Sequence, residues 1–208
     1  MLIAFHDDRL DRVTDRTGVV ARMSWADVRP ALVMGTEPIL QFDELLEALP
    51  DARFNVEPKH DAAVGPLIAI VKRMRALDRI CVGSFSDRRL AIVREAFGSA
   101  ICTSLGTGEV AALRAAAWGL PAFGAMLRRR PGMCVQVPTH AYGVQIVTAR
   151  LVASAHQLRL PVHVWTVNGA NEMGRLLDLG VDGLMTDRPK VLRDVLRGRQ
   201  QWPPTSTR

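Results

Sequence analysis

One C-terminal segment limits the possible fold of this chain most narrowly, because it has the pattern of a strand, a helix and a second strand. Residues 162–168 (VHVWTVN) are a run of β-branched and aromatic residues, residues 171–179 have amphipathic helical spacing, and residues 183–187 are again apolar. The polar residues Asn168 and Asp187 lie where the two strands end. In parallel α/β folds ligands bind at this edge, since the loops that leave the strand C-termini converge there. We therefore expect a parallel sheet with functional residues at that edge.

The same alternation extends over most of the chain. Strand-type apolar runs lie at residues 53–59, 79–85, 100–105, 132–138, 161–168 and 183–187. Segments with helical spacing lie at residues 41–49, 62–77, 87–97, 109–118, 148–160, 171–179 and 190–197. Strands that alternate with helices predict an α/β protein with a parallel sheet.

Length and composition indicate a globular protein with one core. The chain has 208 residues, of which 48% are hydrophobic and 23% charged. No window approaches the roughly 18 apolar residues of a membrane span, so no transmembrane segment is expected. The apolar start, residues 1–5, is too short for a signal peptide before His6 and Asp7 interrupt it. These features predict a cytoplasmic protein.

The net charge of +6 raises the possibility of nucleic-acid binding, since clustered Lys and Arg neutralise phosphates. The basic residues are nearly all Arg and are scattered through helical segments, apart from residues 128–130 and the tail from residue 193 to 199. This distribution is typical of a solvated surface. We therefore expect no nucleic-acid partner, although a positive field would favour an anionic substrate.

Three motifs that combine charged and apolar residues stand far apart in the chain. The first is HDDRLDRVTDRTG at residues 6–18, the second is FNVEPK at residues 54–59, and the third comprises WTVN at residues 165–168 and GVDGLMTDRP at residues 180–189. They resemble the HD-x-x-LDR-x-T, N-x-E-x-K, WTVN and GVDG-x-x-TD-x-P elements of the glycerophosphodiester phosphodiesterase family. Each motif alone is weak, whereas their shared order argues against coincidence.

The resemblance implies a TIM (β/α)8-type barrel. Six strands are identified here, so we expect an incomplete barrel whose first two strands would precede residue 1. Such barrels typically take about 250 residues, and this chain has 208. The predicted organisation is a partial barrel domain at residues 1–198 and a polar tail at residues 199–208. An open sheet leaves unpaired edges, through which the chain could self-associate.

The strand at residues 53–59 has one polar and one apolar face, because side chains alternate along a strand. In a barrel the apolar set is expected to pack beneath the helices, and the polar set to face the barrel interior and its upper mouth. The polar set is Asn55, Glu57 and Lys59, and the apolar set is Phe54, Val56 and Pro58. A structural ion pair between Glu57 and Lys59 is the alternative, but desolvation makes buried pairs weak stabilisers.

The family resemblance gives three residues a role in chemistry. Glu57 matches a metal ligand, and a divalent ion, Mg²⁺ or Ca²⁺, would bind its carboxylate together with a phosphate oxygen. Lys59 matches a residue that faces the substrate phosphate. His6 matches a catalytic histidine that acts as general acid or base, a task that suits an imidazole because histidine side chains can take up and release a proton near neutral pH.

Two further residues are candidates for substrate contact. Trp165 has the same parity as His163 and Val167, so all three are expected to face inward. A tryptophan of the barrel core is one interpretation, and the resemblance favours a pocket wall that packs on the glycerol. Gln136, flanked by valines, is expected to reach the interior and the substrate.

The resulting hypothesis is a metal-dependent enzyme that hydrolyses glycerophosphodiesters, small-molecule substrates of lipid and glycerol metabolism, to glycerol 3-phosphate and an alcohol. We expect little activity from residues 1–208 alone, because Glu57 is the only matched carboxylate ligand and His6 the only matched histidine. The alternative is a noncatalytic truncated relative that binds a phosphate ligand or another protein. A nucleic-acid-binding protein is a third hypothesis, and it predicts affinity that falls steeply with salt. The alcohol, the ion and the oligomeric state are left open.

Overall fold

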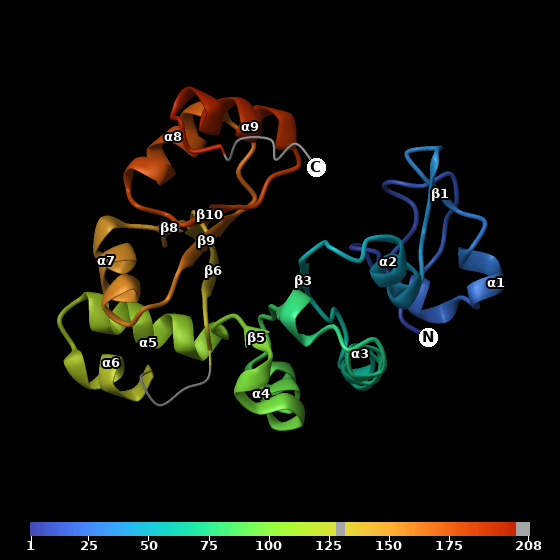
Figure 1. The fold of residues 1–208 in the computed structure, drawn as a ribbon, viewed down its shortest axis with the longest axis horizontal. Coiled ribbons are helices and arrows are strands. Elements are labelled where there is room, and N and C mark those ends of the chain that lie inside the picture. Colours follow the sequence, from blue (N-terminus) through green and yellow to red (C-terminus); the bar gives the residue numbers. More distant parts are fainter. Residues whose placement is uncertain (128–131, 203–208) are drawn as a thin grey trace. The chain divides into compact units, whose positions relative to one another are not determined.

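The structure is a computed structural model that describes residues 1–127 and 132–202. The chain folds into two compact units. The first comprises Met1–Val82 and Ala91–Ile101, and the second comprises Gly83–Leu90 and Cys102–Arg208. Helices and strands alternate along most of the chain (Figure 1).

The first unit begins with a small part that has a core of its own. Its elements are the 3-10 helix η1 (Val20–Arg22), helix α1 (Trp25–Val28) and strands β1 (Leu32–Val33) and β2 (Glu37–Pro38). The two strands form an antiparallel hairpin. The buried side chains of this part are Leu10, Val28, Ala31 and Ile39. None of these elements was predicted, because each is too short to show a periodic pattern.

The remainder of the first unit contains parallel strands that alternate with helices. The elements are α2 (Phe42–Ala48), β3 (Phe54–Val56), α3 (Asp61–Arg73), the 3-10 helix η2 (Leu77–Arg79), β4 (Ile80–Val82) and the 3-10 helix η3 (Gly98–Ala100). Helix α4 (Asp87–Phe97) has residues in both units. Strands β3 and β4 pair in parallel, with Asn55 opposite Cys81. The Phe54 ring contacts Phe42 edge to face, so the apolar face of β3 packs against α2 as predicted.

The second unit has the same alternation and a three-stranded parallel sheet in the order β10-β9-β6. Its strands are β5 (Cys102–Thr103), β6 (Val135–Pro138), β9 (Val162–Trp165) and β10 (Gly183–Leu184), and a hairpin of β7 (His140–Ala141) and β8 (Val144–Gln145) follows β6. Its helices are α5 (Thr107–Ala117), α6 (Pro121–Leu127), α7 (Ala149–Gln157), α8 (Ala170–Asp178) and α9 (Pro189–Gly198). A parallel bridge between Ser104 and Cys134 connects the end of β5 to the start of β6.

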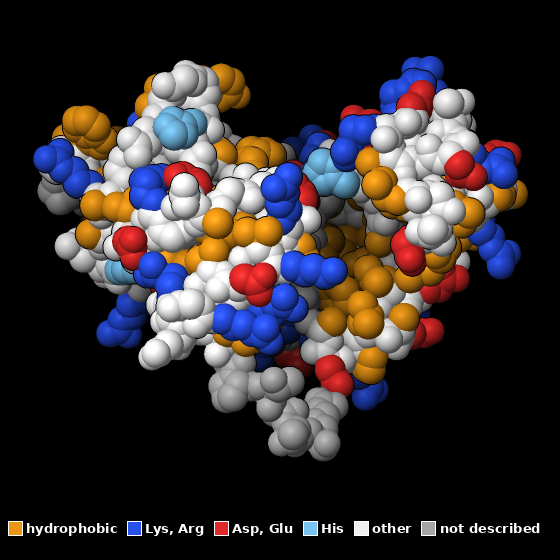
Figure 2. Space-filling view, turned by 90° about the horizontal axis from the view of Figure 1, so that it is seen from above, with side chains coloured by type: hydrophobic (Ala, Val, Ile, Leu, Met, Phe, Trp, Pro, Cys, Tyr) orange, Lys and Arg blue, Asp and Glu red, His pale blue; other side chains and the backbone are white. Residues whose placement is uncertain are grey.

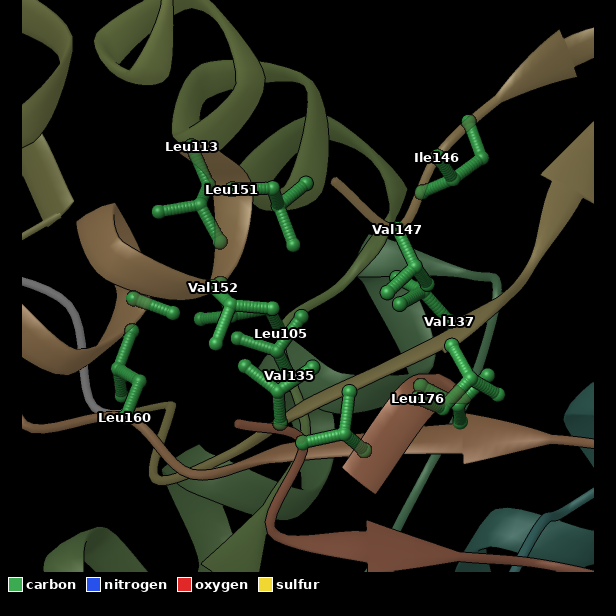
Figure 3. Close-up of a cluster of buried hydrophobic side chains, with 14 of the residues drawn as sticks. Leu105, Leu113, Val135, Val137, Ile146, Val147, Leu151, Val152, Leu160 and Leu176 are labelled. Carbon is green, nitrogen blue, oxygen red and sulfur yellow. The ribbon is translucent and has the colours of Figure 1, made fainter. Parts of the chain in front are cut away.

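The side chains on one face of this sheet belong to the main hydrophobic core of the second unit (Figure 3). Val135 and Val137 of β6 and Val162 and Val164 of β9 are at most 2% exposed and pack against the helices. The helix side chains that meet them include Leu113, Leu151 and Leu176. Alternating apolar residues in strands and amphipathic helices therefore produce the predicted layer.

The opposite face of the sheet has polar side chains at one level. Gln136 lies opposite His163, and His163 lies opposite Gly183. A Cβ atom at Gly183 would lie 2.7 Å from Cδ2 of the His163 ring, and one at Gly83 would lie 2.7 Å from Oε1 of Gln136. Glycine at these two positions therefore leaves room for the two polar side chains.

The six predicted strands and seven predicted helices are all present, but the strands are shorter than their apolar runs. Helix α6 and the β7–β8 hairpin were not predicted. The inward orientation expected for Val167 is wrong: β9 ends at Trp165, the alternation stops there, and Val167 packs in the core with Val162 and Val164. Of the predicted tail, residues 203–208 lie outside the described residues.

Charged side chains of both signs are interspersed with apolar ones on the face shown in Figure 2. Within the described residues, none of the helices has both the length and the apolar character needed to cross a membrane.

The close approach at Gly183 predicts a stability difference between two glycine substitutions. Gly183→Ala should destabilise the protein by about 1–3 kcal/mol, because the new methyl group overlaps the His163 ring in a packed layer. The matched control is Gly174→Ala in α8, where a Cβ meets nothing within 4 Å; it should be neutral or stabilising by up to about 1 kcal/mol. Urea unfolding followed by circular dichroism measures both, and equal unfolding free energies would contradict the expected crowding.

Candidate active site

Two segments of the first unit meet at the predicted catalytic residues. Nε2 of His6 lies 3.2 Å from Nζ of Lys59, although the two residues are 53 positions apart in the sequence. A second contact joins the same segments, since Nε2 of His60 lies 3.1 Å from Oδ1 of Asp8. The loop that begins at His6 is therefore positioned against the residues that follow strand β3.

The Lys59 ammonium also contacts Glu57, at 2.6 Å from Oε2. Both side chains are 30% exposed, so they are partly shielded and still reach solvent. Pro58, between them, is buried, while Glu57 and Lys59 are only partly buried, so the predicted alternation in burial continues through residues 57–59 although β3 itself ends at Val56. Glu57, Lys59 and His6 thus form one continuous polar cluster, which we call the His6 cluster.

Asp7 contacts both His6 and Arg12. Its carboxylate accepts two hydrogen bonds from the Arg12 guanidinium, at 2.6 and 2.9 Å, and Oδ1 lies 2.8 Å from Nδ1 of His6. The Arg12 hydrogen bonds, followed by the contact with His6, hold the pKa of Asp7 well below its usual range. Asp7 contacts the imidazole on its Nδ1 side, while Nε2 faces Lys59. An anchored carboxylate of this kind fixes the orientation of a histidine ring.

The residues of the first motif form the turn that carries these groups. Leu10 is fully buried, and its N–H donates to the carbonyl of Gly18 at 3.0 Å. Asp11 accepts from the Gly18 N–H at 3.1 Å, and the Thr14 hydroxyl donates to the Leu10 carbonyl at 2.9 Å. Gly18 has φ of 143°, a conformation that favours glycine. The turn therefore combines an apolar anchor, two polar side chains that bind the backbone, and one glycine.

The His6 cluster has the donor chemistry of a magnesium or calcium site. Glu57 provides carboxylate oxygens, the ligands that both ions prefer, whereas both oxygens of Asp7 are engaged by Arg12 and one of them also contacts His6. A Mg²⁺ ion commonly uses one or two carboxylates together with water and substrate phosphate. Within residues 1–127 and 132–202, no three carboxylate or histidine side chains converge on a point suited to an ion. The residues present thus fit an ion that is shared with a phosphate ligand.

Trp165 and Gln136 lie in the second unit. Trp165 ends strand β9, and its ring contacts Phe85 edge to face with centroids 5.6 Å apart. Phe85 is 64% exposed, so this aromatic pair is open to solvent. Gln136 is half-buried on the polar face of the sheet, beside Gly83 and Ser104.

The polar residues that follow β9 and β10 hold the two loops together. The Asn168 amide donates to Asp187 at 2.9 Å, and its oxygen accepts from the Thr186 hydroxyl at 3.0 Å and the Asp187 N–H at 2.9 Å. Asp182 accepts from the Val162 N–H at 2.7 Å. Burial raises the pKa of Asp182. The hydrogen bond from the Val162 N–H and the contact with His156 lower this pKa by more, so the pKa of Asp182 lies below its usual value.

Sequence reasoning did not identify Asp7, Arg12 or Phe85 as parts of a site. Asp7 and Arg12 stand within the HDDRLDR motif, where their spacing of five residues is a signal that only the conformation of the turn makes interpretable. Phe85 carried no signal, because an aromatic residue at the end of an apolar run is typical of a core residue. Its exposure follows from the early end of β4.

Comparison with known proteins identifies the relatives of this chain. Residues 1–191 match the glycerophosphoryl diester phosphodiesterase family. The "Probable glycerophosphodiester phosphodiesterase 2" of Mycobacterium tuberculosis is 37% identical over 201 residues, which cover 96% of this chain and 76% of that protein.

Solved structures share the fold at lower identity. A Silicibacter pomeroyi protein assigned as a glycerophosphoryl diester phosphodiesterase superposes with a TM-score of 0.75 at 23% identity, over 97% of this chain and 80% of that one. An Oleispira antarctica phosphodiesterase in complex with sn-glycerol-3-phosphate has a TM-score of 0.73 at 16% identity, over 94% and 79% of the two chains.

The fold and the family match define a hydrolase with an α/β fold of the TIM-barrel type. The chain belongs to the glycerophosphoryl diester phosphodiesterase family, whose members hydrolyse glycerophosphodiesters to glycerol 3-phosphate and are generally metal-dependent. The resemblance found in the sequence motifs is thereby confirmed.

The contact between Asp7 and Arg12 predicts a selective change in titration. Arg12→Gln removes the dominant hydrogen bonds to Asp7, so the pKa of Asp7 should rise toward its usual value of about 3.9. Arg9→Gln is the matched control, because Arg9 instead lowers the pKa of Asp11. Carboxyl carbon chemical shifts measured by NMR against pH follow both residues. An unchanged Asp7 titration in Arg12→Gln would show that this ion pair does not exist in solution.

Proposed function

We propose that the His6 cluster is the catalytic centre of a metal-dependent glycerophosphodiester phosphodiesterase. One observation carries the proposal: Lys59 lies within hydrogen-bond range of both Glu57 and His6, and His6 comes from a segment far away in the sequence. A cation, a proton carrier and a carboxylate at one place are the groups that phosphodiester hydrolysis requires.

Lys59 binds the phosphodiester in this proposal. Its ammonium is a compact charge that attracts the nonbridging phosphate oxygens. Glu57, 2.6 Å away, keeps the ammonium in position when no anion is bound. An incoming phosphate can then replace part of this contact, because both side chains reach solvent.

His6 transfers the proton. When the phosphorus–oxygen bond to the alcohol breaks, the departing oxygen must gain a proton. Nε2 of His6 supplies it after the Lys59 ammonium, which contacts Nε2 in the structure, has turned to the phosphate and Nε2 has taken up a proton. Asp7 and Arg12 act as positioning residues, since Asp7 contacts Nδ1 and leaves Nε2 directed toward the phosphate-binding ammonium. In the net hydrolysis phosphorus gains an oxygen from water, and the proton that this water releases restores the protonated imidazole of His6. The products are glycerol 3-phosphate and the alcohol.

Glu57 is the carboxylate that would hold a divalent ion, Mg²⁺ or Ca²⁺. A bound ion would neutralise charge on the phosphate oxygens as the reaction proceeds. The oxygen-donor character of Glu57 and the metal dependence of the family support this assignment.

Trp165 and Gln136 are proposed to contact the organic part of the substrate. Trp165 presents an aromatic surface that is partly exposed at the carboxyl end of β9, where α/β folds bind ligands. Gln136 offers an amide on the polar face of the same sheet. The Oleispira antarctica structure, which holds sn-glycerol-3-phosphate, supports a glycerol phosphate product for this fold.

The activity test measures glycerol 3-phosphate released from glycerophosphocholine by the full chain, with Mg²⁺, with Ca²⁺ and with a chelator. We expect metal-dependent release that is low, because Glu57 is the only matched carboxylate ligand and His6 the only matched histidine. His6→Asn should lower kcat further, by about 100- to 10,000-fold. Lys59→Met and Glu57→Gln should also reduce turnover strongly, while the matched controls His140→Asn and Glu47→Gln, at exposed positions, should not. If the chain binds glycerol 3-phosphate by calorimetry but releases none in any metal, the hydrolase proposal is wrong and the noncatalytic alternative replaces it.

The positioning role of Asp7 predicts a split between kinetic constants. Asp7→Asn should lower kcat by about 100-fold, because a misplaced proton donor loses its alignment, and should leave KM nearly unchanged since Lys59 still binds the phosphate. Asp27→Asn, which changes a carboxylate in a helix cap of the same unit, is the control. A rise in KM without a fall in kcat would assign Asp7 to substrate binding instead.

A further inference from the structure

Helix α6 is a surface helix without a polar face. Its seven residues, PAFGAML, include no charged side chain and no side chain that forms hydrogen bonds. The inner face is explained: Leu127 is buried in the core of the second unit, and a Cβ at Gly124 would lie 3.7 Å from Cβ of Ala116 in α5. A surface helix normally has polar residues on the face opposite the core. A helix that is apolar on all faces is normally buried, so the outer face of α6 is expected to have a binding partner.

The outer face of α6 and the turn before it expose large apolar side chains. Trp118 is 72% exposed, Leu120 is 52%, Phe123 is 41% and Met126 is 39%. The last three are spaced three residues apart, so they follow one side of the chain as it enters and continues through the helix. Exposed apolar side chains that cluster in this way, rather than singly, mark an interaction surface. We call these four residues the α6 patch.

The sequence stretch that contains the α6 patch carries charge of one sign only. Residues 110–171 contain six Arg and no Asp, Glu or Lys, and the remaining 21 basic residues of the chain equal its 21 acidic residues in number. The whole net charge of +6 is thus contributed by this stretch, which includes most of α5, all of α6 and all of α7. Arg114 precedes Trp118 by one helical turn, and Cζ of Arg150 in α7 lies 5.9 Å from the centre of the Trp118 ring.

We propose that the α6 patch is a docking surface for an anionic lipid bilayer. Apolar side chains enter the boundary between headgroups and acyl chains, tryptophan prefers this boundary, and arginines beside it attract anionic headgroups. Arg150 and Trp118 present both kinds of group side by side. A nucleic acid would bind the arginines but would leave Leu120, Phe123 and Met126 without a partner, and a second copy of the chain would bring like charges together.

The test is sedimentation of the full chain with lipid vesicles at low salt. Binding is expected to vesicles of phosphatidylcholine mixed with an equal amount of phosphatidylglycerol, and not to pure phosphatidylcholine. Leu120→Ser with Phe123→Ser should weaken this binding by about tenfold, because less apolar surface is buried. Arg114→Gln with Arg150→Gln should weaken it by about 25-fold, at roughly fivefold for each charge near the surface.

Matched controls remove the same side chains elsewhere. Met34→Ser with Leu49→Ser removes exposed apolar residues of the first unit, and Arg22→Gln with Arg29→Gln removes exposed charges there; neither should change vesicle binding. Circular dichroism spectra of each variant are compared with that of the unsubstituted chain, so that a loss of binding caused by misfolding is recognised. The readout does not involve hydrolysis, so the proposed catalytic function can fail without affecting it.

Three outcomes would overturn the proposal. The first is absence of binding to the mixed vesicles at low salt, and the second is equal loss of binding in the control variants. The third is a dimer in size-exclusion chromatography that Leu120→Ser with Phe123→Ser dissociates while vesicles are not bound, which would make a second copy the occupant. If duplex DNA displaces the chain from vesicles but vesicle binding still requires Leu120 and Phe123, the lipid assignment stands. If the chain binds duplex DNA and does not bind the mixed vesicles, which is a case of the first outcome, DNA replaces the lipid as the ligand of this surface.

Discussion

The Lys59 ammonium, held between the Glu57 carboxylate and Nε2 of His6, is the interaction on which the candidate active site depends. One positive charge connects a carboxylate suited to a metal ion with an imidazole suited to proton transfer. The contact of Asp8 with His60 is a second link between the first loop and the residues that follow strand β3. Partial exposure matters as much as proximity, because a fully buried cluster could not exchange its internal contacts for a phosphate.

The support for this cluster comes from residues whose tasks are conformational. Arg12 binds Asp7, and Asp7 in turn contacts His6, so the ring is held from the side opposite Lys59. Leu10 anchors the turn in a small core, and Gly18 provides the backbone conformation that closes it. In this chain residues 6–18 thus form a turn that presents the His6 imidazole, and Leu10, Asp11, Thr14 and Gly18 stabilise the turn itself.

The sheet of the second unit has two faces of different character, one buried and apolar and the other polar. Valines of β6 and β9 pack under the helices, while Gln136 and His163 fill the space that Gly83 and Gly183 leave open. The loops that follow are joined through Asn168, whose amide bonds to both Thr186 and Asp187. The same unit contains helix α6, whose outer face is apolar although it does not take part in the hydrophobic core of the unit.

The sequence by itself determined the alternation of strands and helices, the alternating faces of residues 54–59, and the identity of His6, Glu57 and Lys59 as candidates, because periodicity and motif spacing are local properties. It could not determine the short N-terminal elements or α6, whose patterns are too brief to be periodic. Only the tertiary structure decided that Asp7 and Arg12 support His6 and that Phe85 faces solvent beside Trp165. These contacts depend on where the strands end and how the turns close. Both are determined by pairing between residues that are distant in the sequence, which local patterns do not reveal.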